Sequence, residues 1–230
     1  MHKALRIGII AICLGFIFSS VSVSDAKGQG ILGEILRRMD NYNKSLQSLQ
    51  ANMTMVKYDS TLKIADPART GSVSYLLKTK KRYMRMDMQS PEEYISVIGD
   101  EYQLYQPRIN RLVYGKTQGS KGSQGVGNIL SVMNMSKAQL NANYEATYIA
   151  EEQISGGTKT WHIQLSPKTA ADFKLADLWI DVDGTVRQSK ITQKNNDTTT
   201  ILITSIKKNP TIKGDTFKLA FPKNVEKVRG

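Results

Sequence analysis

The sequence has 230 residues, 40% of them hydrophobic, and a formal net charge of +12 at pH 7. That length fits one domain with a sizeable core, or at most two small domains. Lysine and arginine are spread along the chain and form no single block, so solvated strand faces account for most of them. The remaining positive surplus suits anionic lipid headgroups or acidic partners.

Residues 1–26 have the pattern of a secretory signal peptide. Basic residues precede an apolar run at 7–18, and small polar residues follow it up to Ala26. A membrane-spanning helix needs about 20 apolar residues, so a retained anchor is the weaker interpretation. Cleavage after Ala26 fits best, and cleavage after Ser24 fits nearly as well. The pattern predicts a single domain at 27–230 in the periplasm, where nucleic acid is not an expected partner.

The only cysteine, Cys13, lies inside the apolar run of this leader. A lipidated cysteine follows a small residue, whereas Ile12 stands here, so lipid attachment is disfavoured. The cleaved chain then has no cysteine, which excludes disulfides and thiol catalysis. No later segment has membrane-spanning length, which favours a soluble mature protein.

The start of the predicted mature chain has helical periodicity. Apolar residues recur there at spacings of three and four, with charged residues between them. From Ala51 the period changes to two, which predicts a strand through Tyr58. The recurring apolar residues are Ile31, Leu32, Ile35, Leu36, Met39, Tyr42, Leu46 and Leu49.

Short strand-like runs separated by turn signals follow. The clearest run has three methionines on one side, alternating with Tyr83, Arg85 and Asp87 on the other. Gly99-Asp100 is a hairpin signal between two further runs. The strands predicted in this half are 71–79, 81–88, 93–98, 101–106 and 111–116.

A glycine-rich stretch at 115–127 interrupts the strands and predicts a flexible loop. It lacks the Gly-Lys-Ser/Thr ending of a phosphate-binding loop. A short apolar helix is predicted within 126–135, and Ser136 is a candidate N-cap for a second helix running to Asn143. An apolar helix on a glycine hinge fits a lid, and an ordinary core helix after a loose loop fits equally well.

The C-terminal half predicts a meander of antiparallel strands with Gly and Asn turns. Two helical segments are too few to alternate with the strands, which excludes α/β winding. The predicted fold class is therefore mainly β (α+β). We expect a strongly curved antiparallel sheet, or unclosed β-barrel, with an N-terminal helix and a helical lid at its open mouth. The strands expected in this half are 144–154, 158–165, 175–181, 186–194 and 198–207.

No catalytic or metal-binding constellation stands out in the sequence. His162, the only histidine after cleavage, falls in a predicted strand and is interpreted as structural. Glu151 and Glu152 are adjacent, so a strand would point them to opposite faces and make no acid/base pair. Asp181 and Asp183 fit a β-turn better than a calcium loop. These patterns predict a protein that is not an enzyme and needs neither a metal nor a cofactor.

Methionine is frequent and clustered in this sequence. Methionine side chains adapt to flexible apolar ligands, although core packing explains any one of them taken alone. The row formed by Met84, Met86 and Met88, together with an apolar candidate lid, predicts an apolar binding face.

Five short motifs also occur in a fixed order. They are Tyr83 to Pro91, a methionine-rich strand ending in Pro; Tyr105-Gln106-Pro107; Leu165-Ser166-Pro167-Lys168; Asp183-Gly184 with Gln188; and Phe217 to Val225. In this order, and over nearly the whole predicted mature chain, they resemble the periplasmic outer-membrane lipoprotein carrier proteins of the LolA type.

The resemblance implies an unclosed barrel whose apolar concave face is covered by a helical lid. It implies a monomeric carrier that takes lipoproteins from an inner-membrane ABC transporter, shields their acyl chains and hands them to an outer-membrane acceptor. Each acyl CH₂ exposed to water costs about 0.8 kcal/mol, so such a carrier needs an apolar cavity. Release of the cargo needs a movable lid.

The resemblance and strand alternation together imply a set of cavity residues from the methionine strand, its neighbours and the lid. They also suggest Lys80, or alternatively Arg82, as the family's basic residue that gates the lid, with a surface salt bridge as the other interpretation. The cavity set is Met84, Met86, Met88, Ile95, Val97, Tyr102, Leu104, Ile129, Leu130 and Met133.

Three departures from the family pattern leave the cargo open: the basic charge, methionine in place of strand aromatics, and a longer glycine loop. The same half-barrel occurs in lipid or glycolipid carriers and in lipoprotein-sensing regulatory modules. A sensor should have an additional domain, and no boundary for one is visible. A structural or adhesive β-protein is the third alternative, with a closed core and no affinity for amphiphiles.

Overall fold

The computed structural model describes residues 23–117, 136–171 and 173–230, with side chains from residue 28 onward. The predicted leader therefore lies almost entirely outside the described residues, as do the predicted lid residues Ile129, Leu130 and Met133.

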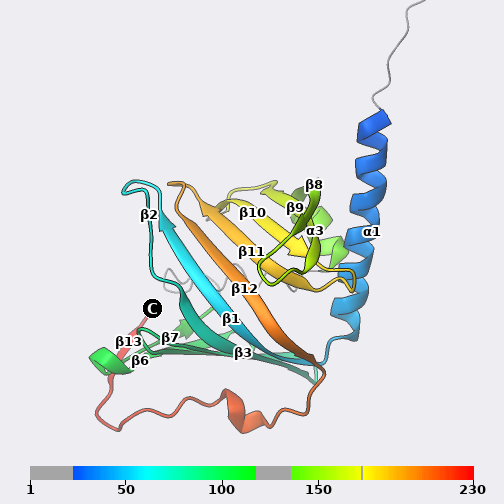
Figure 1. Ribbon diagram of the computed structural model, residues 1–230. Helices are drawn as coiled ribbons and strands as arrows, with labels where there is room; N and C mark the ends of the chain where they lie inside the picture. Colours follow the sequence, from blue (N-terminus) through cyan, green and yellow to red (C-terminus); the bar gives the residue numbers. More distant parts are fainter. Residues whose placement is uncertain (1–22, 118–135, 172) are drawn as a thin grey trace, which may run out of the picture.

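A single thirteen-stranded sheet organises the chain, in the order β13-β7-β6-β5-β4-β3-β1-β12-β11-β10-β9-β8, with β2 paired to β1 off this path. The sheet is strongly curved, since β3–β7 run in a different direction from β1 and β12 (Figure 1). It is unclosed, since its two terminal strands, β13 and β8, do not pair with each other. The strands are β1 (Ser48–Asp59), β2 (Ile64–Ala65), β3 (Arg69–Lys78), β4 (Lys81–Met88), β5 (Glu93–Ile98), β6 (Glu101–Gln106), β7 (Arg111–Lys116), β8 (Tyr144–Gln153), β9 (Lys159–Pro167), β10 (Phe173–Ile180), β11 (Val186–Gln193), β12 (Thr198–Lys208) and β13 (Glu226–Arg229).

This architecture confirms the predicted fold class, and the eleven predicted strands fall within a few residues of their expected bounds, whereas the short strands β2 and β13 were not predicted. Each neighbouring pair is antiparallel except β13 and β7, which are parallel. Two 3₁₀ turns, Pro107–Ile109 and Gly214–Phe217, interrupt the connections.

The N-terminal helix α1 (Val23–Ser45) packs on the inner face of the sheet and buries Ile35, Leu36 and Met39. It begins inside the predicted leader. The prediction that helical periodicity continues to Leu49 is wrong, because the helix ends at Ser45 and Leu49 lies in β1. The side chain of Asn209 accounts for the end of the helix at Ser45.

The Asn209 side chain accepts the backbone N–H groups of Gln47 and Ser48 through Oδ1, at 2.8 and 3.2 Å, and donates to the Ser45 carbonyl at 3.0 Å. Terminal helical groups that would otherwise lack partners are thereby satisfied by a residue that is distant in sequence.

The second described helix, α3 (Lys137–Asn143), starts where the sequence predicts it. Ser136 is its N-cap: the hydroxyl accepts the Gln139 N–H, and the Gln139 side chain accepts the Ser136 N–H. This reciprocal capping box satisfies two backbone donors at the helix start. Leu140 from this helix is buried in the main core.

The C-terminal segment covers the outer face of β4–β7 and runs beneath them in Figure 1. Phe217 is fully buried there against the ring of Tyr83. The Ser96 hydroxyl donates to the Phe217 carbonyl, and the Arg85 guanidinium donates to the Thr216 carbonyl at 2.9 Å. Tyr105, Leu112 and Val225 form a second, smaller apolar cluster on this face.

The turn between β10 and β11 lies directly against α1. Gly184 has a positive φ of +84°, and a Cβ atom there would come within 2.4 Å of the Arg38 backbone. The Arg38 guanidinium donates to the Val182 carbonyl at 2.7 Å. The absence of a side chain at Gly184 therefore lets the turn support the helix.

Candidate functional site

Two apolar rows cross β3–β7 on the inner face of the sheet. Direct cross-strand neighbours lie on the same face, so the register defines each row. The first row is Tyr75, Met84, Val97, Tyr102 and Gly115, and the second is Val73, Met86, Ile95, Leu104 and Val113.

The rows place six of the predicted cavity residues side by side. Met86, Met88, Met84 and Ile95 also contact the main core, the first two being buried and the last two partly exposed. The other three cavity residues of β5 and β6 belong to neither core cluster; they are Val97, Leu104 and Tyr102.

Tyr102 is almost fully buried, because its ring lies over Gly115 and its hydroxyl lies against Gly230. Among the described residues the hydroxyl has no hydrogen-bond partner. Tyr102 therefore closes the end of the first row near β13.

A polar pair ends the apolar face at the other side of the rows. Glu93 of β5 is the cross-strand neighbour of Met88 on β4, and Arg69 of β3 is the cross-strand neighbour of Met55 on β1. Arg69 Nη2 lies 2.8 Å from Glu93 Oε2, and both side chains are largely buried. Arg69 also donates to the Pro91 carbonyl at 2.7 Å, and Gln106 donates to Glu93 at 2.9 Å. These contacts satisfy both charges at the margin of an apolar surface.

A small cavity of about 50 Å³ lies between the end of α1 and the inner face. Burial raises the pKa of Tyr75, and the positive charge of Arg82 acts in the opposite direction. Burial also raises the pKa of Tyr42. Both phenols are therefore neutral at pH 7. The lining residues are Tyr42, Asn43, Leu46, Leu49, Val73, Tyr75, Met84, Thr185, Val186, Ile203 and Ile206.

The two candidate gating residues lie in different settings. Lys80 is exposed in the tight turn between β3 and β4, with a φ of +63°. Arg82 is exposed on β4, two residues before Met84 and on the same side of the strand. The positive charge of Arg82 acts on Tyr75, which lines the small cavity.

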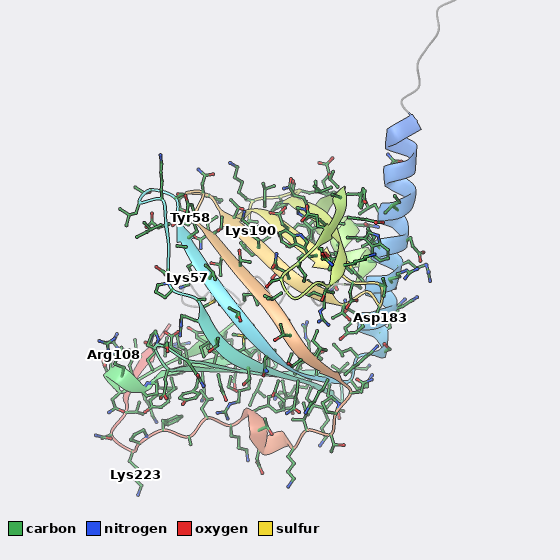
Figure 2. The ribbon with its side chains drawn as sticks, in the orientation of Figure 1. Lys57, Tyr58, Arg108, Asp183, Lys190 and Lys223 are labelled. Carbon is green, nitrogen blue, oxygen red and sulfur yellow. The ribbon has the colours of Figure 1, made fainter. Side chains whose placement is uncertain are left out.

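Basic residues are distributed over the whole molecule. Lys57 lies on β1, Arg108 in the 3₁₀ turn after β6, Lys190 on β11 and Lys223 in the C-terminal segment (Figure 2). This distribution agrees with the scattered charge of the sequence.

His162 belongs to a polar cluster with Glu152 and Asp177. Its ring stacks on Trp179, and its two nitrogens each lie 3.0 Å from a carboxylate oxygen. Because ionised carboxylates only accept, both contacts are hydrogen bonds only when both nitrogens are protonated. Hydrogen bonds from Trp179 and His162 lower the pKa of Glu152. Among the described residues no group of three or more His, Cys, Asp or Glu side chains, this cluster included, is arranged so that it could hold a metal ion.

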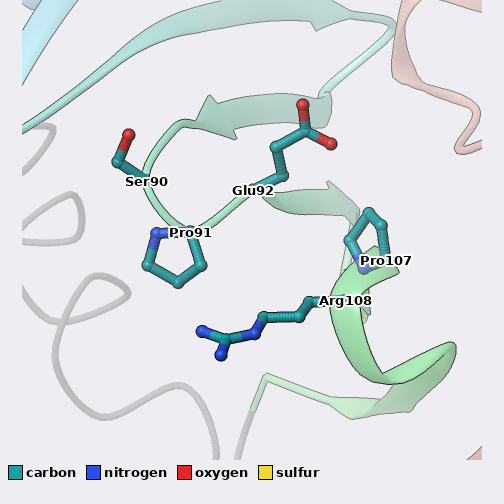
Figure 3. A pocket seen from close by; sticks show the side chains of 5 residues that line it. All are labelled: Ser90, Pro91, Glu92, Pro107 and Arg108. Atoms are coloured by element: carbon teal, nitrogen blue, oxygen red, sulfur yellow. The ribbon is translucent and has the colours of Figure 1, made fainter.

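An open surface pocket lies between two turns and is lined by Ser90, Pro91, Glu92, Pro107 and Arg108. The Arg108 guanidinium points toward Pro91, whereas the Glu92 carboxylate points away from it (Figure 3). None of the predicted cavity residues lines this pocket.

The curved open sheet, whose apolar inner face packs against a helix, defines an unclosed β-barrel fold. A family model for the outer membrane lipoprotein carrier protein LolA matches residues 76–220, and the chain belongs to this family. No curated protein matches the chain. Within the described residues, no helix combines the length and apolar character needed to cross a membrane.

Solved structures support the fold. An uncharacterized conserved protein from Thermus thermophilus has a TM-score of 0.54 at 15% identity, covering 87% of this chain and 99% of that one. MucB has a TM-score of 0.54 at 13% identity, covering 84% of this chain and 64% of that one. The LolA superfamily protein NE2245 from Nitrosomonas europaea has a TM-score of 0.42 at 11% identity, covering 81% and 97%. The first two show the fold alone.

Sequence reasoning missed the polar pair and the contribution of the neighbouring strands. Arg69 and Glu93 are far apart in sequence, and only the register of β1, β3, β4 and β5 brings them together. Tyr75 and Val73 lie in a strand that the sequence predicts. They could have been found by asking which residues of this neighbouring strand share a face with Met84.

Proposed function

We propose that this protein is a periplasmic carrier that holds the acyl chains of lipoproteins against the inner face of its sheet and moves them from the inner to the outer membrane. The observation that carries this proposal is the pair of apolar rows across β3–β7, in a member of a lipoprotein carrier family. At about 0.8 kcal/mol per CH₂, shielding a sixteen-carbon chain is worth roughly 12 kcal/mol.

In this proposal an inner-membrane ABC transporter supplies the cargo and an outer-membrane acceptor receives it. Residues 1–26 direct export, and residues 27–230 act as one monomeric carrier domain without catalysis. The family description, which names an outer membrane lipoprotein carrier, supports this assignment. The polar pair of Arg69 and Glu93 provides a hydrophilic margin where a cargo headgroup leaves the apolar face.

Cargo binding requires the inner face to open. The cavity next to Met84 measures about 50 Å³, whereas pockets that hold small molecules typically measure about 300–1,000 Å³. Ile35 and Met39 of α1 are buried in the same apolar core as Met86 and Met88 of β4. We therefore propose that acyl-chain binding is coupled to displacement of α1 from the sheet.

The first test is mass spectrometry of organic extracts from protein purified without detergent from the periplasm of its native host. Copurified lipoprotein would support the proposal, and free lipid alone would redirect it to a lipid carrier. A protein that is empty and also fails to bind the fluorescent fatty acid cis-parinaric acid would contradict both.

A matched pair of variants then locates the site. Leu104 faces the inner side of β6, and its neighbour Gln103 faces the outer side. Leu104→Asp should weaken cis-parinaric acid binding about tenfold or more, because it places a carboxylate on the apolar face. Gln103→Asp should leave binding unchanged. Equal effects of the two variants would place the acyl site elsewhere.

A further inference from the structure

The two edge strands of the sheet differ in length, because β13 has four residues and β8 has ten. At one edge, β13 pairs with β7 in parallel. At the other edge, β8 pairs with β9, and no other described strand pairs with it (Figure 1). β8 is ten residues long, contains no proline and has no buried residue. A long strand with unpaired backbone groups is a template for another strand.

The backbone hydrogen bonds show which groups of β8 point outward. Lys168 donates to the Asn143 carbonyl at 2.9 Å, and Ile154 donates to the Thr158 carbonyl at 3.0 Å. Hydrogen-bonded and non-bonded pairs alternate in an antiparallel ladder, and one register shift lies between Tyr148 and Ala150. The outward-facing backbone groups are therefore those of Ala146, Tyr148, Glu151 and Gln153.

The side chains give this edge a negative charge. β8 contains Glu145, Glu151 and Glu152 and no basic residue, in a chain whose net charge is +12. Glu151 accepts a hydrogen bond from Trp161 at 3.1 Å, and Glu152 accepts one from Trp179 at 2.7 Å, which fixes both carboxylates. Ile149 is exposed between them and Glu145.

We propose that the β8 edge is a docking site for an extended, basic segment of a partner protein, which adds to the sheet as a further strand. Backbone hydrogen bonds to β8 hold the segment, and alternate lysine or arginine side chains meet Glu145 and Glu152, which the register places on the same face of the sheet, whereas Glu151 lies on the opposite face. A second copy of this chain fits poorly, because two β8 strands would place like charges against each other. This inference does not depend on the acyl-chain site.

The test uses the purified protein and a synthetic ten-residue peptide that alternates lysine with valine. Binding should slow amide hydrogen exchange at Ala146, Tyr148, Glu151 and Gln153, measured by NMR. The same peptide with all of its backbone nitrogens methylated should bind about tenfold more weakly or worse, because it keeps no backbone N–H donor on either edge. This probe needs no change to the protein.

A charge-reversal variant provides the second arm. The Glu145 side chain has no described hydrogen-bond partner, so Glu145→Lys changes the charge and leaves the strand intact. It should weaken peptide binding several-fold and leave cis-parinaric acid binding unchanged. Unchanged exchange at the four amides with saturating peptide would overturn the proposal, as would equal binding of the methylated peptide. Exchange that slows with protein concentration alone would assign the edge to a second copy and overturn the partner proposed here.

Discussion

Replacing Gly184 with alanine should loosen α1 from the sheet and destabilise the protein. A non-glycine residue with a left-handed φ, such as the +84° of Gly184, costs roughly 1–2 kcal/mol. The new Cβ would also lie 2.4 Å from the carbonyl carbon and oxygen of Arg38 and 2.8 Å from the nitrogen of Met39. Since helix backbone cannot rotate away as a side chain can, we add roughly 1–3 kcal/mol for overpacking.

The expected total is therefore roughly 2–5 kcal/mol, which lowers Tm by about 4–20 °C for a domain of this size. Urea unfolding and thermal unfolding both measure it. Tryptophan fluorescence reports the displacement, because the Arg38 guanidinium lies 5.2 Å from the centroid of the Trp161 ring. Displacement of α1 should also increase the affinity for cis-parinaric acid if the helix covers the acyl site.

Gly156→Ala is the matched control, since Gly156 has a φ of +87° and a methyl group added there would have no neighbouring atom within 4 Å. It should cost only the roughly 1–2 kcal/mol of the backbone conformation. Equal destabilisation by the two variants, with unchanged Trp fluorescence in both, would refute the role of the turn as a support for α1.

Three further outcomes are expected. Phe217→Ala should destabilise the protein by about 3–5 kcal/mol in urea unfolding and expose the C-terminal segment to proteolysis, because this ring is fully buried. Ser136→Ala should cost about 1 kcal/mol through loss of the α3 cap, measured in the same way. Hydrogen bonds from Arg37 and Arg38 lower the pKa of Glu34 from 4.5 to about 2. The hydrogen bonds of ionised Glu34 therefore stabilise α1 fully above pH 4.5, and this stabilisation is lost as the pH falls through 2. In a circular-dichroism titration, Glu34→Gln should abolish the loss of helix signal that this protonation causes.

Local patterns were sufficient to predict most elements of the fold. Strict alternation around Met86 predicted β4, and Gly99-Asp100 predicted the β5–β6 hairpin. Ser136 predicted the start of α3 as a candidate N-cap, and the structure completes it with Gln139 as a capping box within four residues. Each of these signals depends on neighbours in the sequence, so no tertiary information was needed.

The remaining features depend on contacts between distant segments. Asn209 ends α1 at Ser45, although the apolar period continues to Leu49, and no local signal at residue 45 indicates this. The candidate site was predicted in part for the same reason. Alternation selected the inner face of β4–β6, whereas the Arg69–Glu93 pair at its margin arises only from the register of several strands.

The position of β1 at the middle of the sheet has a consequence for the order of folding. β1 pairs with β3, but its other partner is β12, so Met53 must find Ile203 across most of the chain. Closing a loop of that length costs entropy before any contact compensates it, and such topologies fold slowly. The inner face cannot form its lasting packing until the C-terminal strands have been synthesised. Until then β1 has only one of its two long neighbours in the sheet, and the core that Met53 shares with Ile203 stays incomplete.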